Sequence, residues 1–214
     1  MTKEQVLDAL LEAKAVAVIR MKDAARLAAT VEALRMGGIT AIEITMTVPG
    51  AVEIIREMAG AKPPGLVLGA GTVLDAAKAL EAAAAGADFV VSPITDRDMI
   101  RACASAGVFV AAGAFTPTEI VGAWKAGSDI VKVFPATSLG PQFFRDLQGP
   151  LPQIRLMPTG GVTVENARDF LSAGACCVGL GSALVDKKAV DNGDWEALTE
   201  RARRLMASLG SVRR

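Results

Sequence analysis

The chain of 214 residues contains no histidine and no tyrosine. This absence excludes Ser-His-Asp and Cys-His catalytic groups, histidine zinc sites, and any tyrosine or histidine acid or base. The three cysteines are Cys103 and the adjacent pair Cys176 and Cys177. Their spacing fits neither a disulfide framework nor a zinc site. We therefore expect the chemistry to use Lys, Glu, Asp, Arg, Thr, Ser or backbone amides, and we predict no metal and no cofactor.

The chain also has no excess of positive or negative charge, since Lys plus Arg and Asp plus Glu both number 23. No basic stripe indicates nucleic acid as a partner, and no apolar run reaches the length of a membrane span. The first residues form a charged, helix-like segment without a secretory apolar region. We expect a cytoplasmic protein whose partner is a small-molecule substrate. A hydrophobic content of 51% is ample for a packed core.

A unit recurs along the chain: an Ala- and Leu-rich helical stretch, a glycine, and a short β-branched run. The glycines at the predicted helix ends are Gly38, Gly86, Gly107, Gly127 and Gly174. The eight runs predicted to be strands are residues 15–20, 41–46, 66–70, 88–92, 108–111, 129–134, 154–158 and 175–180.

Eight such units with helical crossovers predict an α/β fold, a (β/α)₈ TIM barrel with an additional N-terminal helix. A doubly wound open sheet is the competing topology, but the first strand lacks a G-x-G-x-x-G turn. No linker interrupts the repeat, so we expect residues 1–214 to form a single domain. A first helix near 2–13 is expected beneath the barrel, and a last helix near 193–209 on its outside.

Lys132 stands in a run that otherwise reads as a fully buried strand, Ile130-Val131-Lys132-Val133-Phe134. Burying an ammonium is costly unless the group is paired or loses its proton, and a neutral lysine amine attacks carbonyl carbon. The sequence therefore predicts a Schiff-base lysine. The alternative is a strand-end lysine whose ammonium reaches water.

Glu43 is the single ionisable group in another apolar strand, Ala41-Ile42-Glu43-Ile44-Thr45. Because side chains alternate along a strand, Glu43, Thr45 and Thr47 share one face. If that face points into the barrel, Glu43 meets Lys132 there and can move protons. The alternative is an inert buried ion pair, although such pairs often stabilise little.

Glycines follow the seventh and eighth predicted strands, in Thr159-Gly160-Gly161 and in Gly179-Leu180-Gly181-Ser182. In barrels these two loops often bind phosphate through backbone amides at a helix N-terminus. Thr163 is a candidate cap of that helix. The alternative is a pair of tight turns. Thr116-Pro117-Thr118-Glu119 reads mainly as a capped helix start.

Eight short segments in one order resemble a known family. They read VAVIR at 16–20, IEIT at 42–45, GAGTV at 69–73, VSP at 91–93, TPTE at 116–119, VKVFPA at 131–136, PTGG at 158–161 and GLGS at 179–182. The chain resembles the 2-keto-3-deoxy-6-phosphogluconate (KDPG) and 4-hydroxy-2-oxoglutarate (KHG) aldolases, which are class I aldolases on a (β/α)₈ barrel.

The resemblance implies Lys132 as the Schiff-base lysine and Glu43 as the acid and base. Reversible cleavage would give pyruvate and an aldehyde such as glyceraldehyde 3-phosphate. The resemblance further implies substrate contacts by Arg20, Thr72, Pro93, Phe134 and Thr159, phosphate contacts by Gly160, Gly161, Gly181 and Ser182, and a metal-independent homotrimer.

Two positions depart from the family pattern. Thr47, which we place in the substrate site, stands where some members have arginine, and Ala112 stands where many have proline. The loss of a cation leaves the preferred 2-keto acid open. Two other readings stay open: a phosphosugar isomerase or epimerase that uses Glu43 as base, and a non-catalytic scaffold that assembles with itself.

Overall fold

The computed structural model describes residues 1–21, 23 and 26–210. Its eight strands are all parallel and form one sheet, with neighbours in the order β7-β6-β5-β4-β3-β2-β1-β8. The strands are β1 (Ala15–Ile19), β2 (Ala41–Thr45), β3 (Val67–Gly71), β4 (Phe89–Val91), β5 (Phe109–Ala114), β6 (Ile130–Val133), β7 (Leu156–Pro158) and β8 (Val178–Leu180).

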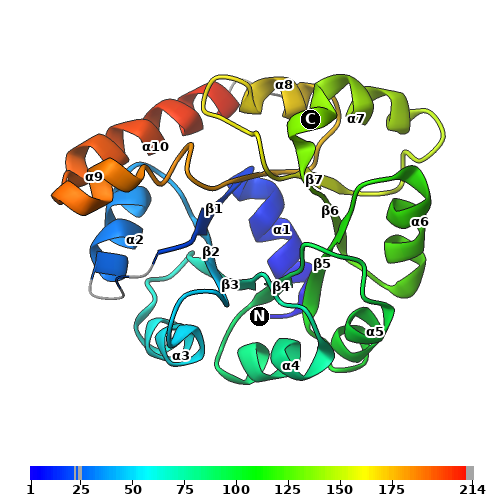
Figure 1. The fold of residues 1–214 in the computed structure, drawn as a ribbon, viewed down its shortest axis with the longest axis horizontal. Helices are drawn as coiled ribbons and strands as arrows, with labels where there is room; N and C mark the ends of the chain where they lie inside the picture. The colour runs from blue at the N-terminus through cyan, green and yellow to red at the C-terminus, as the bar shows by residue number, and fades with distance from the viewer. Residues whose placement is uncertain (22, 24–25, 211–214) are drawn as a thin grey trace.

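Helices alternate with these strands, and the helices that follow the first strand form the outer ring in Figure 1. They are α1 (Lys3–Ala13), α2 (Leu27–Met36), α3 (Ala51–Ala61), α4 (Ala76–Ala84), α5 (Arg97–Ser105), α6 (Pro117–Ala126), the 3₁₀ turn η2 (Ala136–Ser138), α7 (Gly140–Gln148), α8 (Ala167–Ser172), α9 (Lys187–Asn192) and α10 (Trp195–Gly210). All eight predicted strands are present within a few residues of their predicted ends. The helix α9 was not predicted; Asp186 caps it by accepting a hydrogen bond from the amide of Ala189.

The ends of the sheet meet, so the strands close into a barrel. Thr159 and Gly179 form an isolated parallel bridge beyond the end of β7. At the other end of the same seam, the amide of Cys176 donates to the carbonyl of Leu156 over 2.8 Å. The predicted (β/α)₈ barrel is therefore confirmed, including its N-terminal helix.

Glycine ends the helices as the repeat predicted. All five predicted helix-end glycines have positive φ, as at Gly127, where φ is 109°. The chain turns there in the left-handed conformation that glycine adopts without a steric penalty. The amide of Gly127 donates to the carbonyl of Trp124, and β6 begins three residues later.

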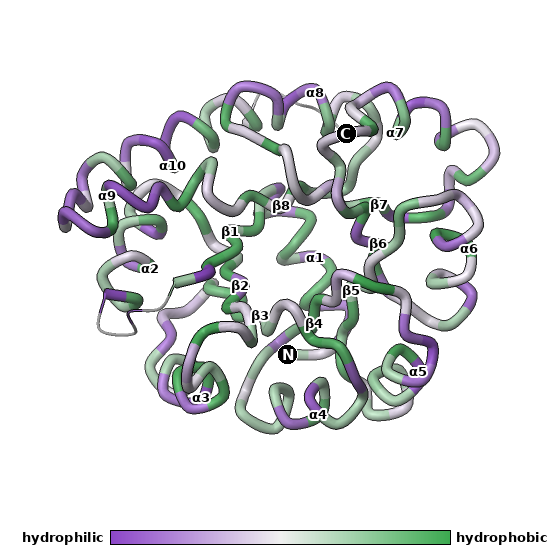
Figure 2. The backbone as a smooth tube through the Cα atoms, viewed as in Figure 1, coloured by the Kyte–Doolittle hydropathy of each residue, from purple (hydrophilic) through white to green (hydrophobic). Residues whose placement is uncertain are grey.

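Two apolar clusters lie on the two sides of the sheet. Between the sheet and the outer helices, alternate strand residues such as Ile42, Ile44 and Val131 join the larger cluster. Inside the barrel, Val6 and Leu10 of α1 pack with a smaller set that includes Phe89 and Phe109. Figure 1 shows α1 lying across the barrel. Figure 2 shows that the strands are mostly hydrophobic, whereas the outer helices alternate between hydrophobic and hydrophilic residues.

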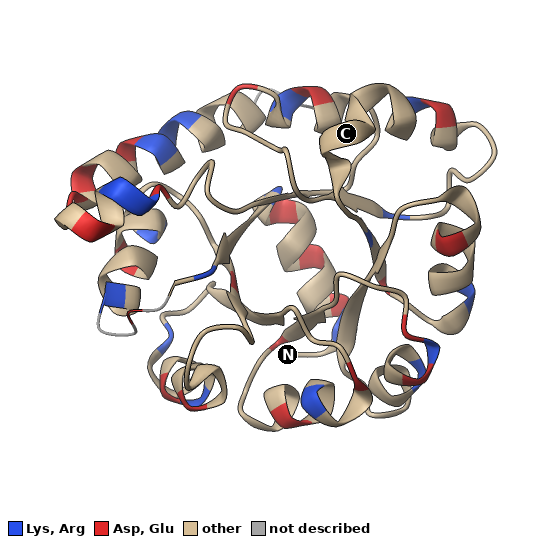
Figure 3. Ribbon diagram, viewed as in Figure 1, with Lys and Arg blue, Asp and Glu red and all other residues tan. Residues whose placement is uncertain are grey.

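Charged residues lie mainly on the outer helices (Figure 3). No helix in the described part of the chain combines the length and the apolar character needed to cross a membrane.

Candidate active site

Strand alternation directs Glu43 and Lys132 into the barrel. Ala41 and Ile130 belong to the inner cluster with α1, whereas Ile42 and Val131 belong to the outer cluster. Residues two positions further along each strand keep the same face. Glu43 and Lys132 therefore lie inside the barrel, one step nearer the carboxyl ends of the strands, with exposed fractions of 1% and 4%.

Lys132 is held between glycine and apolar neighbours. Its register partners are Gly113 of β5 and Met157 of β7. Its Nζ lies 5.1 Å from the centroid of the Phe134 ring, a cation–π distance. Lys132 is thus not the water-exposed strand-end lysine that the alternative reading required.

Glu43 is a buried carboxyl group without a hydrogen-bond partner. Neither Oε1 nor Oε2 accepts a hydrogen bond from the described residues, so Glu43 and Lys132 do not form a hydrogen-bonded ion pair. Burial raises the pKa of Glu43, and the positive charges of Lys132 and Arg20 oppose that rise. A raised pKa brings a carboxyl group closer to the working range of an acid and base at neutral pH.

Gly71 of β3 makes the room that Glu43 occupies. A Cβ atom on Gly71 would lie 1.7 Å from Oε1 of Glu43, far inside van der Waals contact. Only glycine at this position leaves the carboxylate where it is. Gly71 belongs to the segment GAGTV that matches the family, but its steric role was not predicted, because that role depends on which strands become neighbours.

Thr159 is a second buried polar group without a partner. Its exposed fraction is 6%, and its hydroxyl makes no hydrogen bond with the described residues. Gly179 leaves space for that hydroxyl, since a Cβ atom there would lie 2.4 Å from Oγ1 of Thr159. A buried hydroxyl without a partner is costly, so an unpaired one at a barrel mouth indicates a place for a polar ligand.

Arg20, Thr72 and Thr47 stand at the mouth. Nη2 of Arg20 donates to Oγ1 of Thr72 over 3.4 Å. Thr72 has a φ of 57°, an uncommon conformation for a residue with a β-branched side chain. Thr47 shares a 2.8 Å hydrogen bond with Thr45, so its hydroxyl is directed along β2. These contacts bring Arg20 beside Thr72, as a shared substrate site requires.

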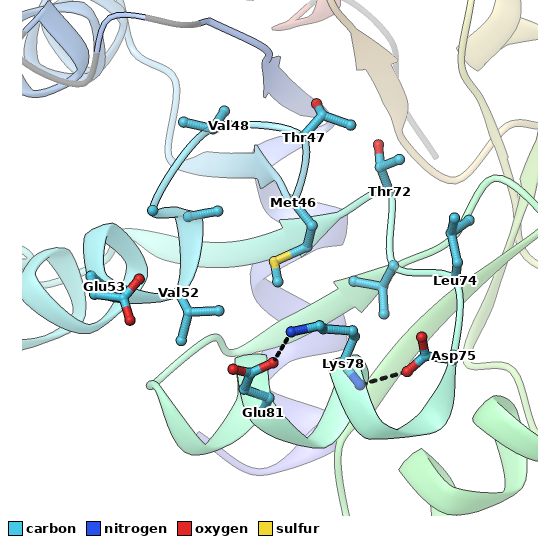
Figure 4. Close-up of a pocket in the computed structure, with 13 residues that line it drawn as sticks. Met46, Thr47, Val48, Val52, Glu53, Thr72, Leu74, Asp75, Lys78 and Glu81 are labelled. Carbon is cyan, nitrogen blue, oxygen red and sulfur yellow. Dashed lines mark hydrogen bonds and ion pairs between the residues drawn. The ribbon is translucent and has the colours of Figure 1, made fainter.

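A cleft of about 470 Å³ opens beside this mouth, between the loops after β2 and β3. Figure 4 shows Thr47 and Thr72 on the side opposite the ion pair of Lys78 with Glu81. Met46, Val48, Val52, Val73 and Leu74 supply most of its apolar lining. This cleft was not predicted from the sequence.

Pro93 and Phe134 each lie against a glycine close to Lys132. A Cβ atom on Gly113 would lie 2.2 Å from the carbonyl carbon of Pro93, so the chain after β4 passes directly over β5. The Phe134 ring approaches Gly160, where a Cβ atom would lie 3.3 Å from the ring. The Phe134 ring therefore lies close both to Lys132 and to the Gly160-Gly161 loop.

The two glycine loops lead into turns rather than directly into helices. Thr163 lies in the turn before α8, which begins at Ala167 with Asn166 as its N-cap residue. The amide of Thr163 donates to Oδ1 of Asn166, and the amide of Asn166 donates back to Oγ1 of Thr163, in the reciprocal pattern of a capping box. Thr163 thus caps the turn that leads into α8, and the amide of Ala167 donates to its carbonyl over 3.0 Å.

Gly181 and Ser182 likewise lead into a turn. The amides of Leu184 and Val185 both donate to the carbonyl of Gly181, and α9 starts only at Lys187. Any anion contact at these loops must therefore use loop amides and hydroxyls rather than the start of α8 or α9. Thr137 of η2, which the sequence analysis missed, stands against Gly161: a Cβ atom there would lie 2.6 Å from Oγ1 of Thr137.

The described residues contain no group of three or more His, Cys, Asp or Glu side chains placed to hold a metal ion. The polar atoms that converge on the mouth are one amine, one carboxylate, one guanidinium and several hydroxyls. This set can form an imine with a ketone, move protons and hold an anion.

Comparisons with known proteins agree with this chemistry. The family model "KDPG and KHG aldolase" matches residues 6–201. A 2-dehydro-3-deoxy-phosphogluconate aldolase from Pseudomonas aeruginosa is 36% identical over 205 residues, covering 95% of this chain and 92% of that protein.

Two solved structures are similar over almost the whole chain. A KDPG aldolase from Legionella pneumophila, with pyruvate captured as a covalent carbinolamine, is 28% identical, with a TM-score of 0.86 and coverage of 96% and 98% of the two chains. A cube-shaped cage designed by fusing symmetric oligomeric domains is 29% identical, with a TM-score of 0.82 and coverage of 91% and 71%. These findings support the predicted aldolase function, a lyase activity, and the chain belongs to the KDPG and KHG aldolase family.

Proposed function

We propose that this protein is a class I aldolase that reversibly cleaves KDPG, or a close 2-keto-3-deoxy or 4-hydroxy-2-oxo acid, to pyruvate and an aldehyde such as glyceraldehyde 3-phosphate. One observation carries the proposal: a buried lysine and a buried carboxylate without a hydrogen-bond partner face the same barrel interior. The covalent pyruvate adduct of the Legionella relative supports the same chemistry.

The reaction starts at Lys132. Its neutral amine attacks the C2 ketone, the carbinolamine loses water, and a protonated imine remains. The ring of Phe134 and the barrel wall keep bulk water from the nitrogen. The imine then serves as the acceptor of the electron pair that the bond cleavage releases.

Glu43 moves the protons. Through a water molecule it takes the proton of the C4 hydroxyl as the C3–C4 bond breaks, and the electron pair passes to the iminium to form an enamine. The aldehyde leaves, Glu43 returns a proton to C3, and water hydrolyses the imine to pyruvate and free Lys132. One carboxyl group serves both transfers because burial raises its pKa toward the working pH.

The substrate carboxylate is held by Arg20, Thr72 and Thr159. Arg20 already donates a hydrogen bond to Thr72, and the hydroxyl of Thr159, which has no partner among the described residues, can donate one to the substrate carboxylate. Thr47 bounds the same mouth without adding a charge, while Pro93 and Phe134 shape its walls. Arg20 then supplies a positive charge in a mouth where Thr47 replaces the arginine of some family members.

The phosphate of the substrate binds to the loops after β7 and β8. Gly160, Gly161, Gly181 and Ser182 are the proposed contacts. Gly160 and Gly161 both have positive φ, of 81° and 78°, so consecutive amides can turn toward one anion.

We further propose a homotrimer formed by single-domain chains of residues 1–214 in the cytoplasm. The similarity to a cage built from symmetric oligomeric domains supports self-association. The three cysteine thiols form no disulfide, which fits a reducing compartment.

Borohydride trapping with pyruvate, followed by peptide mass spectrometry, tests the covalent step. We expect a reduced pyruvyl adduct on Lys132 and none in a Lys132→Met protein. Glu43→Gln should still form the adduct but slow hydrogen exchange at C3 of pyruvate. A folded wild-type protein without an adduct would favour the isomerase or scaffold reading, in which no covalent intermediate forms.

A further inference from the structure

The guanidinium of Arg201, on α10, reaches the loop after β8. Its Nη1 donates to the carbonyl of Ala183 over 3.0 Å, and its Nη2 lies 3.9 Å from Oδ2 of Asp186. Ala183 directly follows Gly181 and Ser182, two of the proposed phosphate contacts. The amides of Ser182 and Ala183 donate to none of the described residues, and consecutive amides of this kind can bind an anion. Arg201 therefore fixes the residue that carries one of these two amides.

The loop after β7 contacts the same side of α10. Arg204 lies three residues beyond Arg201, and residues at this spacing are neighbours on a helix surface. Its Nη2 is 3.6 Å from Oε1 of Glu165. Hydrogen bonds from its own backbone and from Thr163 lower the pKa of Glu165, and the charges of Arg204 and Arg201 add to that lowering. Arg201 is thus close enough to act on both loops.

The contacts of Glu165 continue to the glycine pair of its loop. The amide of Glu165 donates to Oγ1 of Thr163, and Thr163 is bonded to Asn166. Nδ2 of Asn166 in turn donates to the carbonyl of Gly161 over 3.0 Å. A short chain of hydrogen bonds therefore leads from the arginines of α10 to Gly161, one of the proposed phosphate contacts.

The helix α10 is the link between the two loops. In the described part of the chain, no hydrogen bond or ion pair joins residues 160–166 directly to residues 181–186. The helix is itself held from behind by α2, since a Cβ atom on Gly37 would lie 2.4 Å from Cβ of Ala202. The distance between the loops is therefore set by a fixed helix and the arginines that it carries.

We propose that Arg201 is a positioning residue that holds the loops after β7 and β8 around one phosphate group and so makes this chain selective for phosphorylated 2-keto acids. The inference rests on the proposed aldolase function and names the substrate class of its site. A guanidinium suits the task because its rigid fork can bond a carbonyl and a carboxylate at once. Its positive charge also favours a phosphate dianion nearby. If Arg201 only attached α10 to the barrel, phosphorylated and unphosphorylated substrates would be affected alike.

Steady-state kinetics of Arg201→Met with KDPG and with its unphosphorylated analogue, 2-keto-3-deoxygluconate, test the proposal. We expect the KM for KDPG to rise about tenfold with little change in kcat. Inorganic phosphate, used as a competitive inhibitor, should bind about tenfold more weakly. The kcat/KM for 2-keto-3-deoxygluconate and the hydrogen exchange at C3 of pyruvate should stay at the wild-type level, because neither involves a phosphate group.

Two neighbouring arginines of α10 serve as controls. Arg203 is paired with Glu200 of the same helix and with neither loop, so Arg203→Met should keep the wild-type KM. Arg204→Met removes a largely exposed ion pair with Glu165 and should raise the KM for KDPG only about twofold.

Three results would overturn the proposal. A folded Arg201→Met protein with an unchanged KM for KDPG would remove the positioning role, and an equal loss with KDPG and 2-keto-3-deoxygluconate would make that role purely structural. A wild type that exchanges the C3 protons of pyruvate but does not prefer KDPG would refute the phosphate selectivity alone.

Failure of the aldolase function itself looks different. A wild type that neither cleaves KDPG nor exchanges the C3 protons of pyruvate would refute the proposed reaction. If Arg201→Met misfolds, Arg201→Lys replaces it: the charge is kept and the fork is lost. We then expect a rise of about threefold in the KM for KDPG and none for 2-keto-3-deoxygluconate.

Discussion

At the amino-terminal end of the barrel, polar groups are paired and the interior is filled. The helix α1 begins with a capping box between Thr2 and Gln5, packs Val6 and Leu10 among the strands, and is fixed by the ion pair of Lys3 with Asp129, 2.9 Å apart. At the carboxyl-terminal end, Glu43 and Thr159 are buried with their side-chain oxygens unpaired. The same strands thus build a stable floor and a mouth that leaves polar groups for a ligand.

The difference shows where stability and function separate in this fold. The floor satisfies its polar groups internally, so a change there should alter the free energy of unfolding more than the reaction. The mouth keeps groups unsatisfied, so a change there should alter the reaction and can even stabilise the protein. Four predictions test this separation, in order of decreasing effect.

Lys132→Met should lower aldol cleavage by at least about 10³-fold, because the nucleophile is lost while the apolar stem is kept. Steady-state assays with KDPG measure the effect. Lys3→Met is the matched control at the floor and should retain wild-type turnover. Aldol activity near the wild-type level in Lys132→Met would remove the Schiff-base role.

Gly71→Ala should reduce turnover by about 10²-fold, because the added Cβ occupies the position of Oε1 of Glu43 and displaces the carboxylate. Gly60→Ala is the control: its Cβ would meet nothing within 4 Å, and the residue lies in α3. The control should keep activity and gain up to about 1 kcal/mol in stability. Equal turnover in the two variants would show that the position of Glu43 does not matter.

Glu43→Gln should raise the free energy of unfolding at pH 7, on the order of 1–3 kcal/mol. Because burial raises the pKa of Glu43, the folded protein holds this proton to a higher pH than the unfolded chain does. Wild-type stability therefore falls as pH rises above the unfolded value of about 4.3, whereas the glutamine variant avoids this loss. Denaturant titrations of the wild type and the variant at pH 4 and pH 7 measure the difference in their free energies of unfolding. A gain that is larger at pH 4 than at pH 7 would contradict the raised pKa.

Lys3→Met should cost about 0.2–1 kcal/mol in the free energy of unfolding, because the ion pair with Asp129 is partly exposed. Urea denaturation measures the loss. Adding salt should shrink the difference between the variant and the wild type. A cost several times larger would mean that the floor depends on this single pair.

Much of the barrel could be predicted because its information is local. Each helix-ending glycine, each β-branched run and the capping box at Thr116 act over a few residues, and all are present. Alternation along β2 and β6 was enough to place Glu43 and Lys132 on inward faces. The roles of these residues in the reaction stay predictions.

What could not be predicted depends on contacts between distant segments. The turn before α8 is closed by reciprocal hydrogen bonds between Thr163 and Asn166, so the helix itself begins only at Ala167. The steric role of Gly71 appears only when β3 lies beside β2, and the cleft needs two loops held side by side. Thr137 had no distinguishing pattern, since its place against Gly161 is set by η2.

The closure of the barrel by α1 also has a kinetic consequence. Because Val6 and Leu10 fill the amino-terminal end of the barrel, the substrate must enter and both products must leave through the mouth at the carboxyl-terminal end. In the proposed reaction the aldehyde is the outer fragment, and pyruvate would stay bound to Lys132 until its imine is hydrolysed. The closed end of the barrel and this covalent bond would together fix the order of release: the aldehyde first and pyruvate second. In the synthetic direction pyruvate would then have to enter before the aldehyde.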